Sequence, residues 1–227
     1  MKLRALLGST CIASLTLAAT PAAADTTVGS DSSTPLVTSS AGDIVIKRDA
    51  ELNVANGAAI TVNSNNDVSL EDDDEDDSED EPGTITAGKG NGANGILVQP
   101  GVATTISNGG TISVLEDFEP EDEDANSLAD GAIASASNRY GIRVAGGGTV
   151  TGSIENSGAI TVEGQNSGGI VVDSTLDGSI ITSGTIRVIG ENAVGVRTAD
   201  VTGNIVLEGT TNVTGRGARA LSVEGDV

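Results

Sequence analysis

Carboxylates are the side chains with the widest scope for chemistry in this chain. It has 33 Asp and Glu residues against 11 Lys and Arg, and no histidine. A Ser-His-Asp triad and a histidine-ligated metal are therefore excluded. A Ser-Lys dyad would have to use Lys47 or Lys89, neither of which stands in a nucleophile motif. Paired carboxylates could serve a glycosidase, but Phe118 and Tyr140 are the only aromatic rings available to stack on a sugar. We expect no catalytic site and no enzyme activity.

Two acidic blocks offer the remaining chemistry, which is cation binding. They span Glu71–Glu81 and Glu116–Asp124. Runs of like charge repel and stay solvated, so both blocks are predicted to be loops. Calcium prefers carboxylate oxygens, and its weak candidate ligands are Asp72, Asp73, Asp74, Asp76 and Asp77. Because neither an EF-hand loop nor a G-G-x-G-x-D nonapeptide is present, the sequence predicts diffuse calcium binding and no other cofactor.

A glycine motif near the middle of the chain has the spacing of a dinucleotide-binding turn. Gly90, Gly92 and Gly95 spell G-x-G-x-x-G. A dinucleotide site needs a helix after these glycines, whereas the segment 96–98, Ile-Leu-Val, has the character of a strand. The three glycines are therefore predicted to turn corners of the fold.

The N-terminus has the pattern of a secretory signal peptide. Met1–Arg4 is basic, Ala5–Ala19 is apolar, and Pro21–Ala24 has small residues in the A-x-A pattern. Cleavage is predicted after Ala24. The only cysteine, Cys11, lies inside this segment, and its surroundings do not match a lipoprotein cleavage site. We expect an exported protein that has neither disulfides nor a lipid anchor.

Charge narrows the range of partners. The formal net charge is −22, and it becomes −24 when Lys2 and Arg4 leave with the signal peptide. Such a surface repels phosphate backbones and anionic lipids. No later segment approaches the roughly 20 apolar residues that a spanning helix needs. The sequence thus predicts no nucleic-acid partner and no direct membrane insertion.

Short phrases recur in a fixed order along the second half of the chain. TGSI, NSGAITV and GIVV, between 151 and 172, return as LDGSI, TSGTIRV and GVRT and then as VTGNI, EGTTNV and ALSV. Gly158, Gly184 and Gly209 mark a period of about 26 residues, which lies in the range of solenoid repeats. Gly83 and Gly110 fit the same register, with the second acidic block inserted before the next unit.

Each unit holds three segments in which apolar and polar residues alternate, as in half-buried strands. The inward residues of one unit are predicted to be Ile160, Val162, Ile170, Val172, Leu176 and Ile180. Those predicted to point outward are Thr161, Val171 and Asp177, together with Arg143, Arg187 and Arg197 in their own segments. The fold class is therefore predicted to be all-β, a right-handed parallel β-helix with three strands per coil and no helices.

This pattern divides the chain into three parts. Residues 1–24 are the signal peptide, and 25–82 hold the first strands and the first acidic insertion. Residues 83–227 form the β-helix coils, with the second insertion near 116–130. A single coil buries too little apolar surface to fold alone, so neighbouring coils must stabilise one another. The last coil stops at Val227 without a cap, which predicts that the natural protein continues or that this chain is a truncated product.

The phrases NSGAITVEG, SGTIRVIG and GIVV, with a signal peptide and no cysteine after it, resemble the passenger region of bacterial autotransporters, the type V secretion family. The resemblance covers most of Gly83–Val227. It implies a β-helix displayed at the cell surface or outer membrane of a Gram-negative bacterium, or released from it. It also implies a partner, an outer-membrane β-barrel translocator, whose strand pattern this sequence lacks. Fibrous adhesins secreted through a separate partner have similar repeats.

Two functions follow from the resemblance. The first is that of an adhesin or scaffold in adhesion or autoaggregation, whose partner is a surface or matrix receptor or a second copy. The alternative is an inert stalk of a larger autotransporter, whose active module, an enzyme included, lies outside this sequence.

Overall fold

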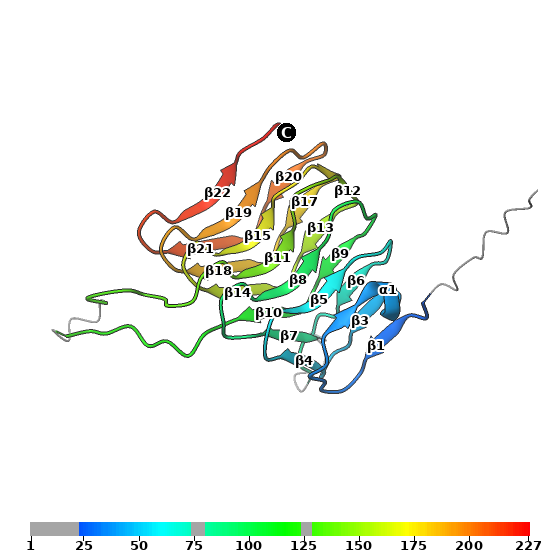
Figure 1. Ribbon diagram of the computed structural model, residues 1–227, viewed down its shortest axis with the longest axis horizontal. Coiled ribbons are helices and arrows are strands. Elements are labelled where there is room, and N and C mark those ends of the chain that lie inside the picture. Colours follow the sequence, from blue (N-terminus) through cyan, green and yellow to red (C-terminus); the bar gives the residue numbers. More distant parts are fainter. Residues whose placement is uncertain (1–22, 74–79, 124–128) are drawn as a thin grey trace, which may run out of the picture.

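A computed structural model describes residues 23–73, 80–123 and 129–227, and shows a nearly all-β rod of stacked coils (Figure 1). Strands of successive coils pair in parallel and form three sheets. Sheet A contains β1 (Thr26–Val28), β3 (Ile44–Ile46), β6 (Val68–Leu70), β9 (Ile106–Asn108), β13 (Ile154–Asn156), β17 (Ile180–Thr182) and β20 (Ile205–Leu207). Sheet B contains β4 (Glu51–Val54), β7 (Thr84–Ala87), β10 (Thr111–Val114), β14 (Ala159–Glu163), β18 (Thr185–Ile189) and β21 (Thr210–Thr214). Sheet C contains β2 (Leu36–Val37), β5 (Ala58–Val62), β8 (Asn94–Val98), β11 (Tyr140–Val144), β15 (Gly168–Val172), β19 (Val194–Thr198) and β22 (Arg219–Val223). The predicted right-handed parallel β-helix with three strands per coil is confirmed.

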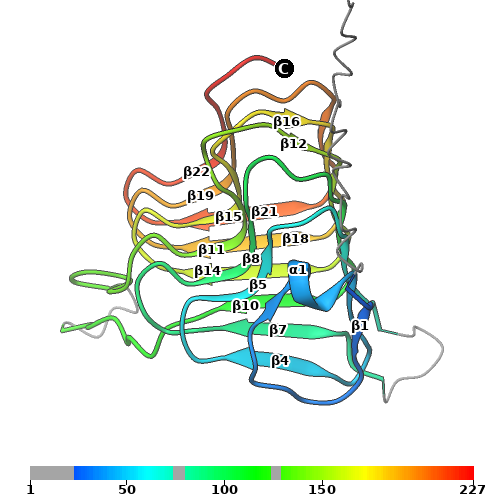
Figure 2. The ribbon, with the colours of Figure 1, turned by 45° about the vertical axis from the view of Figure 1, so that its right-hand side comes forward.

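Each coil passes from sheet C to sheet A and then to sheet B (Figure 2). A short extra pair, β12 (Val150–Thr151) and β16 (Leu176–Asp177), lies between sheets C and A in two of the coils. Ile154 pairs with Ile180 and Ile180 with Ile205, so the coil step is 26 and then 25 residues. The period marked by the sequence glycines is therefore the length of one coil.

The two acidic insertions lengthen single coils without breaking the register. Val68 pairs with Ile106, a step of 38 residues that includes the first insertion. Ile106 pairs with Ile154, a step of 48 residues that includes the second. The described parts of both insertions contain neither helix nor strand, as predicted. The stack therefore continues past each of them.

The core consists of aliphatic columns that run along the rod. The six residues predicted to point inward are at most 1% exposed. Ile85, Ile112, Ile160 and Ile186 are paired in this order across successive strands of sheet B, so the two inner isoleucines each pack between two others. Thr161 and Asp177 lie outside the core, as do the three arginines predicted to point outward. The predicted alternation is confirmed.

Val171 points away from the core as predicted, but it is not exposed to solvent. Its exposed fraction is 0%. Its neighbours across the strands are Arg143 of β11 and Arg197 of β19, and it forms a second hydrophobic cluster with Tyr140 and Val194. Alternation gives the direction of a side chain but not what covers it, and long arginine stems can cover apolar surface.

Backbone contacts explain the glycines at the turn from sheet A into sheet B. A Cβ atom on Gly158 would lie 2.0 Å from the carbonyl oxygen of Gly110, and one on Gly184 would lie 2.0 Å from that of Gly158. No side chain fits between coils stacked at this distance. The glycine period in the sequence therefore records close approach of successive coils.

One single-turn helix departs from the expectation of no helices. α1 (Thr38–Ala41) lies between β2 and β3, and buried Thr38 accepts a hydrogen bond from the amide of Asn63 at 3.0 Å. Four residues are too few to produce a 3.6-residue period in the sequence. Within the described ranges, no helix is long and apolar enough to cross a membrane. Residues 1–22 of the expected signal peptide lie outside those ranges.

Candidate functional site

The first acidic insertion leaves the rod from a fixed base. Lys47 Nζ donates to Glu71 Oε1 at 2.5 Å, and Arg48 Nε donates to the carbonyl oxygen of Asp72 at 2.7 Å. At the other end, the amide of Glu81 donates to Asp49 Oδ1 at 2.9 Å. The hydrogen bond from Lys47 holds the pKa of the Glu71 carboxyl below its usual value. Residues 47–49 of one coil therefore bind both ends of the insertion in the next.

The structure places two of the five candidate calcium ligands. Asp72 and Asp73 are exposed at the start of the first insertion. The other three, Asp74, Asp76 and Asp77, lie outside the described residues. Where the chain is described, no group of three or more His, Cys, Asp or Glu side chains could hold a metal ion. Diffuse calcium binding stays a prediction.

The second insertion is closed at its neck by one carboxylate. Glu116 accepts hydrogen bonds from the amide of Ser135 at 2.7 Å, from its hydroxyl at 2.8 Å and from the amide of Ala136 at 2.7 Å. Beside it, Asp117 pairs with Lys89 at 2.6 Å. Beyond this neck, the described residues of the insertion project well away from the coils (Figure 1). The carboxylates of these residues are thus presented at a distance from the rod, on a base that the coils hold in place.

A buried arginine beneath this neck joins three successive coils. Arg139 is 0% exposed, and its guanidinium donates to the carbonyl oxygens of Gly88 at 2.9 Å, Leu115 at 2.7 Å and Glu163 at 2.5 Å. Gly88 and Leu115 directly follow β7 and β10, and Glu163 is the last residue of β14. Burial lowers the pKa of the Arg139 guanidinium. The negative charges of Glu116 and Glu163 act in the opposite direction and raise it. The guanidinium therefore holds together the coils from which the insertion starts and to which it returns.

Sequence reasoning missed Arg139, although a signal was present. The equivalent positions in neighbouring coils, directly before each strand of sheet C, are Ala93, Ser167 and Ala193. A large cation where other repeats have small residues indicates a specific local role.

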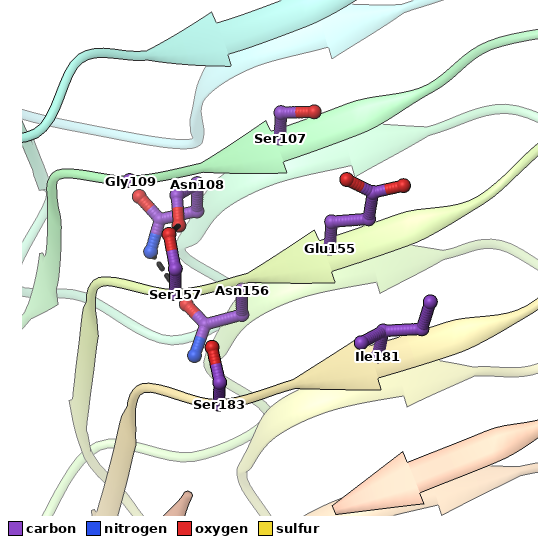
Figure 3. Close-up of a pocket in the computed structure, with 8 residues that line it drawn as sticks. All are labelled: Ser107, Asn108, Gly109, Glu155, Asn156, Ser157, Ile181 and Ser183. Atoms are coloured by element: carbon purple, nitrogen blue, oxygen red, sulfur yellow. Dashed lines mark hydrogen bonds between the residues drawn. The ribbon is translucent and has the colours of Figure 1, made fainter. Parts of the chain in front are cut away.

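A shallow groove of about 250 Å³ lies on sheet A, where β9, β13 and β17 end (Figure 3). Asn108 and Asn156, which line it, belong to a ladder of polar side chains. Asn108 Nδ2 donates to Asn156 Oδ1 at 2.6 Å, and Asn156 Nδ2 donates to Thr182 Oγ1 at 3.3 Å. Glu155 is the one carboxylate among the lining residues, so the groove lacks the carboxylate pair of a glycosidase. The ladder is best explained as a contact that stabilises the stack.

The remaining motifs are structural. The G-x-G-x-x-G segment leads into a strand as predicted, and Gly92 has a left-handed backbone with φ of 73° at a turn. The prediction of a corner is wrong for Gly95, which lies inside β8. A Cβ there would lie 2.4 Å from Cγ2 of Ile112, so packing across the core explains this glycine. The ammonium groups of Lys47 and Lys89 are paired with the carboxylates of Glu71 and Asp117, not with a serine.

Comparison with protein families gives one match. Residues 2–217 match the model of the BigA third pectate lyase-like domain. The chain belongs to this family. The pectate lyase-like name fits a stack of coils that forms three parallel sheets. The name describes a fold, and it does not transfer an activity to this BigA-type domain. No curated protein and no solved structure matches the chain.

Proposed function

We propose that this chain is a non-enzymatic passenger, exposed at the surface of a Gram-negative bacterium or secreted, that acts as an adhesin or scaffold. The observation that carries the proposal is the unbroken strand register on both sides of each acidic insertion. The rod supports the insertions without depending on them for its stacking. The family match, to a domain of a bacterial surface protein, supports the location.

The chemistry of the insertions indicates the kind of contact they make. The described part of the second insertion exposes Glu119, Glu121 and Glu123, which attract cationic groups or divalent ions that bridge to a second anionic surface.

Beads coated with the purified chain test this role. Their adhesion to a surface coated with extracellular matrix is measured with and without roughly millimolar calcium. We expect Glu119→Gln/Glu121→Gln/Glu123→Gln to weaken adhesion. The matched control, Glu155→Gln/Glu208→Gln/Glu224→Gln, removes the same charge from the coils and should leave adhesion nearly unchanged. Equal losses of adhesion for both triple variants would show that adhesion depends on net charge and not on the insertion.

A further inference from the structure

Four asparagines of this chain are followed directly by glycine. The pairs are Asn56–Gly57, Asn91–Gly92, Asn94–Gly95 and Asn108–Gly109. The carbonyl carbon of an asparagine side chain is an electrophile, and the backbone nitrogen of the next residue can attack it. Glycine in that next position favours the attack, because it has no Cβ to hinder the approach and its backbone adopts many conformations. Each pair can therefore react unless the fold holds its two groups apart.

Two of the pairs lie just before and at the start of β8, and hydrogen bonds hold them there. Asn91 Oδ1 accepts from the amide of Ser137 at 2.8 Å, and the amide of Gly92 donates to the carbonyl oxygen of Ser137 at 2.9 Å. Asn94 is 5% exposed, and its Nδ2 donates to the carbonyl oxygen of Gly92 at 2.8 Å. In both pairs the side-chain amide must leave a partner before it can react.

The pair at the end of β9 is held inside the stack. Asn108 is 1% exposed, and its Nδ2 donates to Asn156 Oδ1 at 2.6 Å. The amide of Gly109 donates to the carbonyl oxygen of Leu70 at 3.0 Å. Both groups are thus bound to neighbouring coils, and freeing them costs the free energy of local unfolding.

Asn56–Gly57 differs from the other three pairs. It lies at the corner between β4 and β5, where both residues are exposed (Figure 2). Within the described ranges, neither the Asn56 side chain nor the amide of Gly57 has a hydrogen-bond partner. The electrophile and the nucleophile of this pair are therefore both free in the folded chain.

We infer that Asn56–Gly57 is a modification site at which the folded chain deamidates spontaneously. The backbone nitrogen of Gly57 forms a bond to Cγ of Asn56, the bond from Cγ to Nδ2 breaks, and ammonia leaves with the proton of the Gly57 amide. Water then opens the succinimide ring at either of its two C–N bonds. The products are aspartate and isoaspartate, each of which carries one negative charge more than asparagine. The reaction consumes only water, and the inference goes beyond the proposed surface role and does not depend on it.

The isoaspartate product should loosen the pairing of this corner with the next coil. Its backbone runs through the former side chain and is longer by one carbon atom. The next coil covers the corner closely, since a Cβ on Gly88 would lie 2.3 Å from the carbonyl oxygen of Ala55 and 2.8 Å from Cα of Asn56. The carbonyl oxygen of Gly57 also accepts a hydrogen bond from the amide of Asn94 at 3.1 Å. We expect this bond to weaken in the isoaspartate form, whereas the aspartate form keeps the length of the native backbone.

Incubation of the purified chain in mildly alkaline buffer tests the site, because loss of the amide proton promotes ring closure. Peptide mapping by mass spectrometry at successive times measures deamidation at each pair. We expect the rate at Asn56 to exceed the rate at each of the other three pairs at least about tenfold, since those pairs must open locally before they react. In guanidinium chloride, where no fold protects them, the four pairs should react at similar rates.

Two variants complete the test. Asn56→Gln keeps the amide but would have to close a larger ring, so its peptide should stay unmodified. Asn56→Asp carries the new charge on a native backbone, so amide exchange at Asn94 should match that of the fresh chain and accelerate only in the aged one. Unchanged exchange at Asn94 in a chain that has formed isoaspartate would contradict the expected loosening. A folded chain that reacts at Asn91 or Asn108 as fast as at Asn56, or that leaves Asn56 intact while the unfolded chain reacts, would overturn the proposal.

Discussion

A Cβ atom on Gly141 would lie 2.4 Å from Cγ2 of Ile160. The same distance separates a Cβ on Gly169 from Cγ2 of Ile186. Isoleucines of sheet B thus fill the space that glycines of sheet C leave open. A Cβ on Gly169 would also lie 2.7 Å from the carbonyl oxygen of Gly195, a backbone atom that cannot rotate away. Packing across the core therefore demands glycine in these strands.

We expect Gly169→Ala to lower the free energy of unfolding by about 2 to 3 kcal/mol, because the extra carbon overpacks the core. Chemical denaturation measures the change. The control is Gly90→Ala, where a Cβ would meet nothing within 4 Å and the effect should stay within about 0.5 kcal/mol. Similar values for both variants would contradict the packing argument.

The second prediction concerns Ile170 and Val171, neighbours that face opposite sides of sheet C. Ile170→Asp should unfold the adjacent coils, because an unpaired carboxylate in an apolar core costs several kcal/mol. Val171→Ala should cost about 1 to 2 kcal/mol, since Val171 is 0% exposed. The outward Thr161→Asp serves as the silent control. Thermal unfolding compares the melting temperatures of the three variants. An unchanged melting temperature for Val171→Ala would contradict the burial of this side chain.

Val171 and Arg139 show where sequence reasoning reached its limit. The direction of Ile160 and the glycine period at Gly158 follow from local spacing, because parallel coils repeat the same environment at each turn. Burial of Val171 depends on arginines in two other coils, and the role of Arg139 depends on three carbonyl oxygens far apart in the chain. Contacts of this kind leave no periodic signal. The candidate site was therefore predicted as acidic loops, without the base that holds them.

The polar ladder on sheet A gives a third prediction. Asn156→Leu alone should cost about 2 to 3 kcal/mol, because it removes the partner of buried Asn108. Leu70 and Leu207 occupy the same column at its two ends, so leucine fits there. Asn108→Leu/Asn156→Leu should then cost less than the sum of the single changes by at least about 1 kcal/mol. Denaturant unfolding of the double-mutant cycle measures this coupling, and strict additivity would show that the ladder has no energetic role.

Acid should loosen the base of the first insertion. The pKa of Glu71 is lowered in the folded chain by its hydrogen bond with Lys47. Its stabilisation is therefore complete above the ordinary value of 4.5 and is lost as the pH falls through the lowered pKa. Amide exchange of Gly83, which donates to the Glu71 carbonyl oxygen, should accelerate in this range after correction for intrinsic rates. The change should be absent in Glu71→Gln and at the distant amide of Thr185.

The last prediction is that the first insertion is dispensable for folding but contributes to the response to divalent ions. The amide of Gly83 lies 2.9 Å from the carbonyl oxygen of Glu71, so the chain closes the insertion within a short span. Deleting Asp72 to Asp80 removes a run of like charges whose repulsion opposes compaction. The melting temperature should stay unchanged or rise slightly, and calcium-promoted aggregation of cells that display the rod should fall.

Deleting residues 117–134 as well, with the neck residues Glu116 and Ser135 joined, should abolish that aggregation. Aggregation that persists would place the adhesive surface on the faces of the coils. A large loss of stability in the first deletion would indicate an ordered metal site within the insertion.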